Sequence, residues 1–193
     1  MDRETYISGV LNPLKQWSHL GERIDPFGTH LIGRFCKDHP LAYMHEVYLP
    51  ATEEDIRIAQ KHLRVKISNQ MQEFLLLSNG LSFFSPAGVH VFGVNVAAIY
   101  PESVATPWRF PNDIVSGNSV EWLEDFPSTT IMVARNDGVN SYLLLLEEGG
   151  PMIEYDPIED EEYGEWDSFD HWLLDEIENL ANQHDENGTL MKI

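Results

Sequence analysis

Residues 49–80 read LPATEEDIRIAQKHLRVKISNQMQEFLLLSNG, and this stretch decides the fold because it encodes two consecutive capped helices. Thr52 precedes three acidic residues. Its side chain can accept a hydrogen bond from a first-turn backbone N–H, while the acids favour the positive end of the helix dipole. Ile56, Ala59 and Leu63 recur at spacings of three and four residues, which places one apolar stripe against a core. We therefore predict a first helix that is half-exposed.

The second helix of this stretch is much more apolar than the first. Ser68 is its predicted N-cap. Its apolar side chains are Met71, Phe74, Leu75 and Leu77. We predict that Gly80, following Asn79, closes this helix in the left-handed conformation, because glycine adopts a positive φ without steric cost. With so few polar positions, this second helix is expected to be buried.

Strands dominate the second half of the chain. Apolar and aromatic runs predict strands at Val89–Val96, Thr129–Arg135, Ser141–Leu146 and Met152–Tyr155. Asp137-Gly138 is a tight-turn sequence, so the strands beside it are expected to pair as antiparallel neighbours. Ser168 caps a last helix whose apolar stripe includes Trp172. Helices before and after a run of strands predict an α+β fold with a mostly antiparallel sheet flanked by helices.

This order of elements resembles the SUKH superfamily, which includes fungal cell-wall synthesis regulators and many bacterial toxin-immunity proteins. The segments that carry the resemblance are Leu49-Pro50, the acidic helix start, Asn79-Gly80, the strands around Asp137-Gly138, Pro151–Asp156, and Ser168-Phe169 followed by Trp172-Leu173. Each segment alone is common, but their order and spacing are moderately specific. The resemblance runs from Leu49 to Leu180 and implies a SUKH-like fold. It also marks Pro50, Asn79, Gly80, Asp137, Gly138 and Trp172 as structural motif residues.

The first 45 residues have no counterpart in the minimal SUKH domain. Apolar residues at helical spacing from Tyr6 to Trp17 predict an N-terminal helical extension, in which Pro13 breaks or kinks the helix. Glycines and prolines in Gly21–His45 predict an irregular connector over the core. The expected parts are an N-terminal helical extension and connector (1–45), a SUKH-like domain (46–182) and a C-terminal tail (183–193).

Length and composition indicate one domain plus an extension. The chain has 193 residues, of which 42% are hydrophobic, enough for a sizeable core. Cys36 is the only cysteine, so an intramolecular disulfide cannot form and a reducing compartment is expected. The start of the chain lacks the apolar run of a secretory signal, and no unbroken apolar run in the sequence is longer than Tyr142–Leu146. We expect a cytoplasmic protein.

The charge is strongly negative and unevenly distributed. The net charge is −20, from 32 acidic and 12 basic residues, and no lysine or arginine occurs between Arg135 and Lys192. Nucleic acid and anionic membranes would repel such a surface over a Debye length of about 8 Å, so neither is an expected partner. A basic protein is the favoured partner. Alternatively, the acids form a solvated face that keeps the protein soluble and monomeric.

Common catalytic signatures are absent from the sequence. It contains no phosphate-binding Gly-x-x-x-x-Gly-Lys, no dinucleotide Gly-x-Gly-x-x-Gly after a strand, no Gly-x-Ser-x-Gly and no His-Glu-x-x-His. Cys36, His39 and His45 are too loosely spaced to match a structural zinc site. We therefore expect no enzyme activity, no cofactor and no metal. A hydrolase with paired carboxylates and a metal is the least favoured alternative.

The segment Pro101–Pro127 is rich in proline and is predicted to be a long surface excursion. Its apolar anchors are Trp108, Phe110, Trp122, Leu123 and Phe126. These aromatic residues either fix the excursion to the core or, where acids surround Trp122, form a hot spot for a basic partner. The candidate partner-contact residues are Trp122, Glu124, Asp125, Glu159, Asp160, Glu161 and Glu162.

The resemblance implies two functions without catalysis. The first is an immunity protein that binds and neutralises a cognate bacterial polymorphic toxin. Toxins that act on nucleic acid tend to be basic, so an acidic inhibitor would meet them rapidly and in a defined orientation. The alternative is an intracellular scaffold or regulatory adaptor like the fungal cell-wall synthesis regulators.

Overall fold

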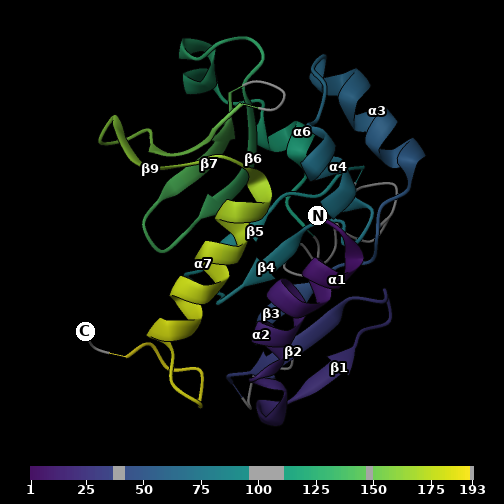
Figure 1. Cartoon of the computed structure of the whole chain (residues 1–193), viewed down its shortest axis with the longest axis vertical. Coiled ribbons are helices and arrows are strands. Elements are labelled where there is room, and N and C mark those ends of the chain that lie inside the picture. Colours follow the sequence, from purple (N-terminus) through teal and green to yellow (C-terminus); the bar gives the residue numbers. More distant parts are fainter. Residues whose placement is uncertain (37–41, 96–110, 147–149, 192–193) are drawn as a thin grey trace.

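One antiparallel sheet organises the molecule (Figure 1). The computed structural model describes residues 1–36, 42–95, 111–146 and 150–191. Their strands are β1 (Glu22–Ile24), β2 (His30–Arg34), β3 (Tyr43–Val47), β4 (Leu81–Phe83), β5 (Val89–Val91), β6 (Ile131–Asn136), β7 (Ser141–Leu145), β8 (Met152–Asp156) and β9 (Glu161–Trp166). These strands form a nine-stranded sheet whose spatial order is their order along the chain. Each strand therefore pairs, antiparallel, with its sequence neighbours.

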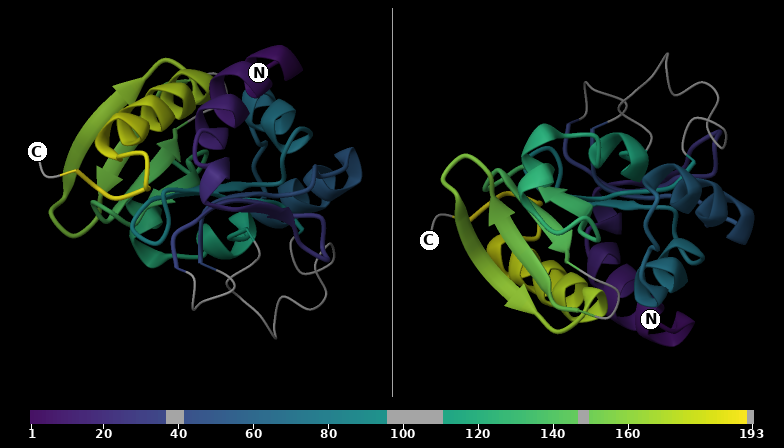
Figure 2. Two further views of the ribbon diagram at one scale, coloured as in Figure 1. Left: turned by 90° about the horizontal axis from the view of Figure 1, so that it is seen from below. Right: turned by 90° about the horizontal axis from the view of Figure 1, so that it is seen from above.

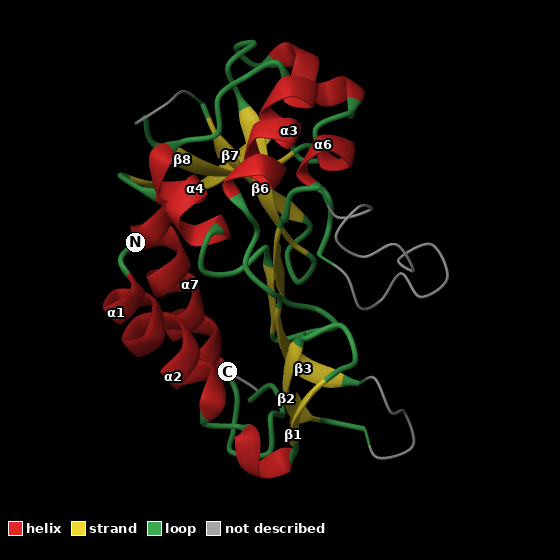
Figure 3. Ribbon diagram, turned by 90° about the vertical axis from the view of Figure 1, so that its right-hand side faces the viewer, coloured by secondary structure: helices red, strands yellow, loops and turns green. Residues whose placement is uncertain are grey.

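Helices cover both faces of this sheet. The helical elements are α1 (Arg3–Thr5), η1 (Tyr6–Leu11), α2 (Asn12–Lys15), η2 (Ser18–Leu20), α3 (Glu53–Leu63), α4 (Asn69–Leu75), α6 (Ile114–Gly117), η4 (Glu121–Asp125) and α7 (Phe169–Gln183). Figures 2 and 3 show α1, α2 and α7 side by side on one face, here called the helix face, with α6 on the opposite face. The predicted α+β fold with a mostly antiparallel sheet and an N-terminal helix is confirmed.

Three of the predicted helix caps are present. Thr52 Oγ1 accepts from the Asp55 N–H at 3.2 Å, and Asp55 Oδ2 accepts from the Thr52 N–H at 2.9 Å, which completes a capping box. Ser68 caps α4 and Ser168 caps α7 through hydrogen bonds from the third residue of each helix. The predicted starts of all three helices are therefore confirmed.

The predicted end of α4 is wrong. This helix ends at Leu75, with Leu76 as a right-handed C-cap, five residues before Gly80. Gly80 does have a positive φ of 96°, but it lies directly before β4 and does not end the helix. A Cβ atom there would lie 2.7 Å from Pro111 Cβ and 2.9 Å from the Val91 carbonyl oxygen. Close approach of β5 and the following segment therefore requires glycine at this position.

The buried side chain of Asn79 joins this turn to the segment after β5. Its Nδ2 donates to the Val94 carbonyl oxygen at 2.9 Å, and its Oδ1 accepts from the Val94 N–H at 2.7 Å. Asn79 and Val94 are both fully buried. Since buried backbone groups need partners, this side chain replaces a strand pairing that the sheet does not supply at Val94.

The N-terminal region differs from the sequence prediction. Pro13 does not interrupt the helical run, because the turn before it is π-helical and the Asn12 N–H bonds to the Ile7 carbonyl oxygen. This wider turn accommodates a residue that lacks an N–H. The segment Gly21–His45, predicted as an irregular connector, contains β1, β2 and the start of β3. Gly33, with a φ of 73°, allows β2 to pass close to Trp17 and Met44.

The acidic segment after β8 also differs from the prediction. The strands predicted from the sequence end at Tyr155, but Glu161–Trp166 forms a further strand, β9, at the edge beside β8. Exposed glutamates suit such an edge because like charges discourage pairing with another chain. The first part of the predicted excursion, 101–110, lies outside the described residues together with Trp108 and Phe110.

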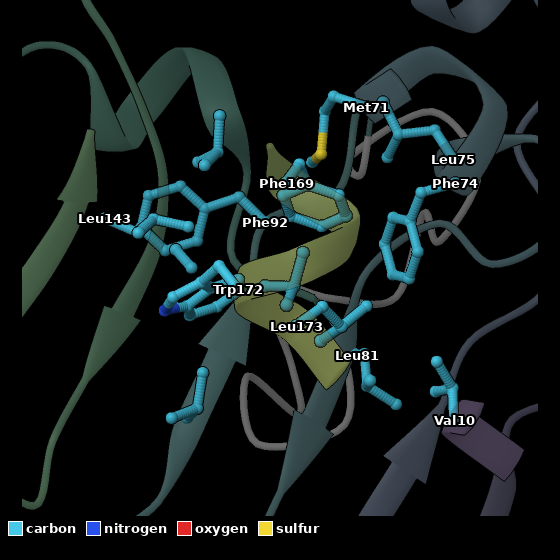
Figure 4. Close-up of a cluster of buried hydrophobic side chains, with 14 of the residues drawn as sticks. Val10, Met71, Phe74, Leu75, Leu81, Phe92, Leu143, Phe169, Trp172 and Leu173 are labelled. Atoms are coloured by element: carbon cyan, nitrogen blue, oxygen red, sulfur yellow. The ribbon is translucent and has the colours of Figure 1, made fainter. Parts of the chain in front are cut away.

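The main core lies between the helix face of the sheet and the helices that cover it (Figure 4). Trp172 and Phe169 of α7 are 2% and 1% exposed, and Phe169 packs edge-on against Phe74 of α4 at 5.2 Å between ring centroids. Tyr6 of η1 contacts the same Phe74 ring. The N-terminal helices, α4 and α7 therefore share one core. Within the described residues, no helix combines the length and apolarity needed to cross a membrane.

Candidate partner-binding surface

Four aromatic side chains gather on the opposite face of the sheet. Tyr142 of β7 is directly opposite Tyr155 of β8, so both rings point to the same side. Trp122 of η4 lies over them, with ring centroids 5.3 Å from Tyr142 and 5.8 Å from Tyr155. Phe126 packs edge-on against Tyr155 at 5.0 Å. We call Trp122, Phe126, Tyr142 and Tyr155 the aromatic cluster, and all four are half-buried.

Acidic residues from two separate segments meet at this cluster. The Tyr155 hydroxyl donates a hydrogen bond to Asp160 Oδ1 at 2.6 Å. This bond raises the pKa of Tyr155 to about 12, and the nearby charges of Asp125 and Asp156 act in the same direction. Asp125 is the last residue of η4 and Asp160 lies in the β8–β9 turn, so the structure brings two candidates from separate segments to the same tyrosine.

The remaining candidate residues divide between the two faces. Glu162 is paired with Tyr155 and therefore shares its side of the sheet, whereas Glu161 is paired with Asp156 and lies toward the helix face. Glu159 is exposed in the turn, where its N–H donates to Asp156 Oδ1. Glu124 is exposed on η4. Among these four residues, Glu162 is the one whose register places it beside the aromatic cluster.

A groove adjoins the aromatic cluster through Phe126. It has a volume of about 570 Å³ and runs between the C-terminal end of α3 and η4. Leu63, Val115 and Leu123 supply apolar lining, and Glu121 and Glu124 add negative charge. A groove with apolar and acidic side chains in its lining is suited to a segment that carries both apolar and basic side chains.

Asp137, in the turn after β6, contacts two basic side chains, Arg135 and His90. Arg135 precedes it on β6 and is directly opposite Tyr142, and the Arg135 guanidinium contacts Asp137 through Nε at 3.2 Å. His90 Nε2 lies 3.4 Å from the same carboxylate. Burial lowers the pKa of His90, while Asp137 opposes that shift. Gly138 allows this turn to approach the segment before β5, since a Cβ there would lie 2.7 Å from the Ala87 carbonyl oxygen.

Sequence reasoning did not single out Tyr142 or Tyr155 for binding. Both were assigned to strands, and strand periodicity alone predicts which face each residue takes within its own strand. Their juxtaposition depends on the β7–β8 register and on the return of η4 over the sheet. The Trp122-to-Asp125 segment could be recognised because an aromatic residue flanked by acids is unusual for a core anchor.

Two members of the sequence cluster considered for zinc, Cys36 and His45, lie within the described residues. His45 is fully buried, with its ring 5.3 Å from that of Trp17 and 4.8 Å from that of Phe84. Burial lowers its pKa to about 3. His39 lies outside the described residues. In the described ranges, no group of three or more histidine, cysteine, aspartate or glutamate side chains is placed to hold a metal ion.

The fold and the order of its motifs define the chain as a SUKH-type α+β protein. In a comparison with family models, the model of the SMI1 / KNR4 family (SUKH-1) matches residues 50–175. The chain therefore belongs to the SMI1 / KNR4 family (SUKH-1). A search of curated proteins finds no match. The matched range includes the aromatic cluster, Asp125, Asp160 and Glu162.

Proposed function

We propose that this protein is an immunity protein that binds and neutralises a cognate bacterial toxin, with no catalysis of its own. The observation that carries the proposal is the meeting of Trp122, Tyr155 and two acidic segments on one face of the sheet. Half-buried aromatic residues surrounded by charge are typical of protein-binding hot spots. Membership of a SUKH family supports the same function.

The charge of the chain supports a basic toxin domain as the partner. A net charge of −20 would accelerate encounter with a positively charged protein and orient it. Toxin domains that act on nucleic acid need a positive surface for their substrate. We propose that the aromatic cluster contacts this surface, with Asp125, Asp160 and Glu162 as charged partners around it.

A binding experiment tests the proposal directly. The purified protein is mixed with the polymorphic toxin encoded next to it, and affinity is measured by calorimetry together with protection of cells that express the toxin. A complex with protection is the expected result. Absence of both would remove the immunity function, and capture of housekeeping proteins from cells that lack the toxin would favour a regulatory adaptor.

Trp122→Ala is expected to weaken toxin binding roughly thirtyfold, about 2 kcal/mol, because central aromatic residues dominate interfaces of this kind. Titration of the toxin into each variant measures the change. Trp166→Ala is the matched control: Trp166 is also half-buried, but it faces α7, where its Nε1 donates to Asp175. Equal losses of affinity in the two variants would contradict the assigned surface.

A further inference from the structure

A second cavity lies on the helix face, on the other side of the sheet from the aromatic cluster. It has a volume of about 570 Å³ and is bounded by the C-terminal half of α7, the β6–β7 turn, β8 and the segment after α7. This volume is typical of small-molecule sites. The cavity is therefore separate from the proposed partner surface.

Two buried carboxylates line this cavity. Glu154 of β8 and Glu176 of α7 are 9% and 8% exposed. Asn136 Nδ2 lies between them, 3.4 Å from Glu154 Oε1 and 3.2 Å from Glu176 Oε1. The Ser141 hydroxyl also donates to Glu154 Oε1. The two acids thus share one amide donor across the sheet–helix boundary.

The described lining offers these carboxylates one ionisable base, His184. None of the described residues that line the cavity is a lysine or arginine. Both hydrogen bonds to Glu154, from Asn136 and Ser141, go to its Oε1. Burial and the charge of Glu154 raise the pKa of Glu176 to about 7. Two buried carboxylates in a cavity whose described lining holds His184 but no lysine or arginine are complementary to a positively charged group.

The mouth of the cavity is unusually apolar. Phe35, Val139, Tyr163 and Leu190 line it, and they are between 45% and 61% exposed. Large apolar side chains that converge at one opening indicate a binding surface more strongly than the same residues scattered over the molecule. The cavity therefore offers an apolar entrance and a negatively charged interior.

We propose that this cavity binds a small organic cation, in which an ammonium or guanidinium group sits between Glu154 and Glu176 and an apolar body lies against Val139 and Leu190. Charge-assisted hydrogen bonds to the carboxylates position the cation. The apolar body removes the exposed rim from water. This site does not depend on the proposed toxin partner, because it lies on the other face of the sheet.

Titration with 2-phenylethylammonium chloride tests the site, using the full chain, calorimetry and thermal unfolding. Saturable binding is expected, and 2-phenylethanol, which keeps the ring but not the charge, is expected to bind at least about tenfold more weakly. No saturable binding of the ammonium, or equal binding of the alcohol, would overturn the proposal. Binding of a lysine-containing peptide without binding of the ammonium would also overturn it.

Two variants assign any binding to this cavity. Glu154→Gln/Glu176→Gln is expected to lose about tenfold or more in affinity for the ammonium, since charge-assisted bonds become neutral ones. Glu154→Gln alone gives the same test if the double variant does not fold by circular dichroism. Glu178→Gln, an exposed change on the same helix, is the control and is expected to bind as the unmodified protein does. Full affinity in both cavity variants would place the cation elsewhere.

Discussion

Replacing Asn79 by alanine is expected to lower the free energy of unfolding by about 4 kcal/mol, since each buried backbone group left without a partner costs about 1–3 kcal/mol. The variant leaves two such groups, the Val94 N–H and the Val94 carbonyl oxygen, which Asn79 pairs at 2.7 Å and 2.9 Å. Both residues are fully buried, so water cannot replace the lost side chain without opening the core.

Urea unfolding followed by circular dichroism measures this effect through the midpoint, provided that the slope of the transition is unchanged. Asn182→Ala is the matched control, because Asn182 is exposed on α7 and the same truncation there removes no buried bond. A loss below about 1 kcal/mol in the Asn79 variant would mean that Val94 finds other partners.

Glu176→Gln is expected to stabilise the protein at pH 8 by about 3 kcal/mol relative to the unmodified chain. The folded-state pKa of Glu176 is raised to about 7 from an ordinary value of 4.5, so the folded state holds a proton that the unfolded state releases. That contribution to stability is complete below pH 4.5 and is lost as the pH rises through 7. Glutamine stays neutral and avoids the loss.

Unfolding curves of Glu176→Gln and of the unmodified chain at pH 5 and pH 8 measure this effect as the difference between their free energies of unfolding. At pH 5 the gain should fall to roughly 1 kcal/mol, because Glu176 is then protonated in the folded state of the unmodified chain. His45 is present in both proteins, so its opposing contribution cancels in the difference between their free energies of unfolding. The lowered pKa of His45 destabilises the fold in acid. Glu178→Gln serves as the control on the exposed side of α7, and a similar pH dependence there would refute the assignment to Glu176.

Helix caps and tight turns are predictable from the sequence because they depend on residues close together in the chain. The caps at Thr52, Ser68 and Ser168 follow from side chains that bond within three residues. The turn at Asp137-Gly138 is equally local, and the strands on both sides of it are present. Gly80 misled the prediction because a positive φ serves a close approach to β5 as well as a helix end.

Long-range arrangement is what local signals cannot supply. Glu161–Trp166 is a strand because it completes the edge beside β8, although its acids are typical of a loop. Glu154 sits in an acidic stretch, yet strand alternation turns it toward α7 and buries it. For the candidate surface, Asp125 and Asp160 are recognisable individually, but their meeting at Tyr155 depends on sheet register.

The match between spatial and sequence order in the sheet has a consequence for how such proteins diversify. Since every strand pairs with its sequence neighbour, a longer insertion between two strands leaves all pairings intact, and each doubling of a flexible loop costs only about 0.6 kcal/mol. The insertion between β5 and β6 carries Trp122 and Phe126. If this segment carries the partner contacts, as proposed above, its exchange would change the specificity while the strand pairings stay the same.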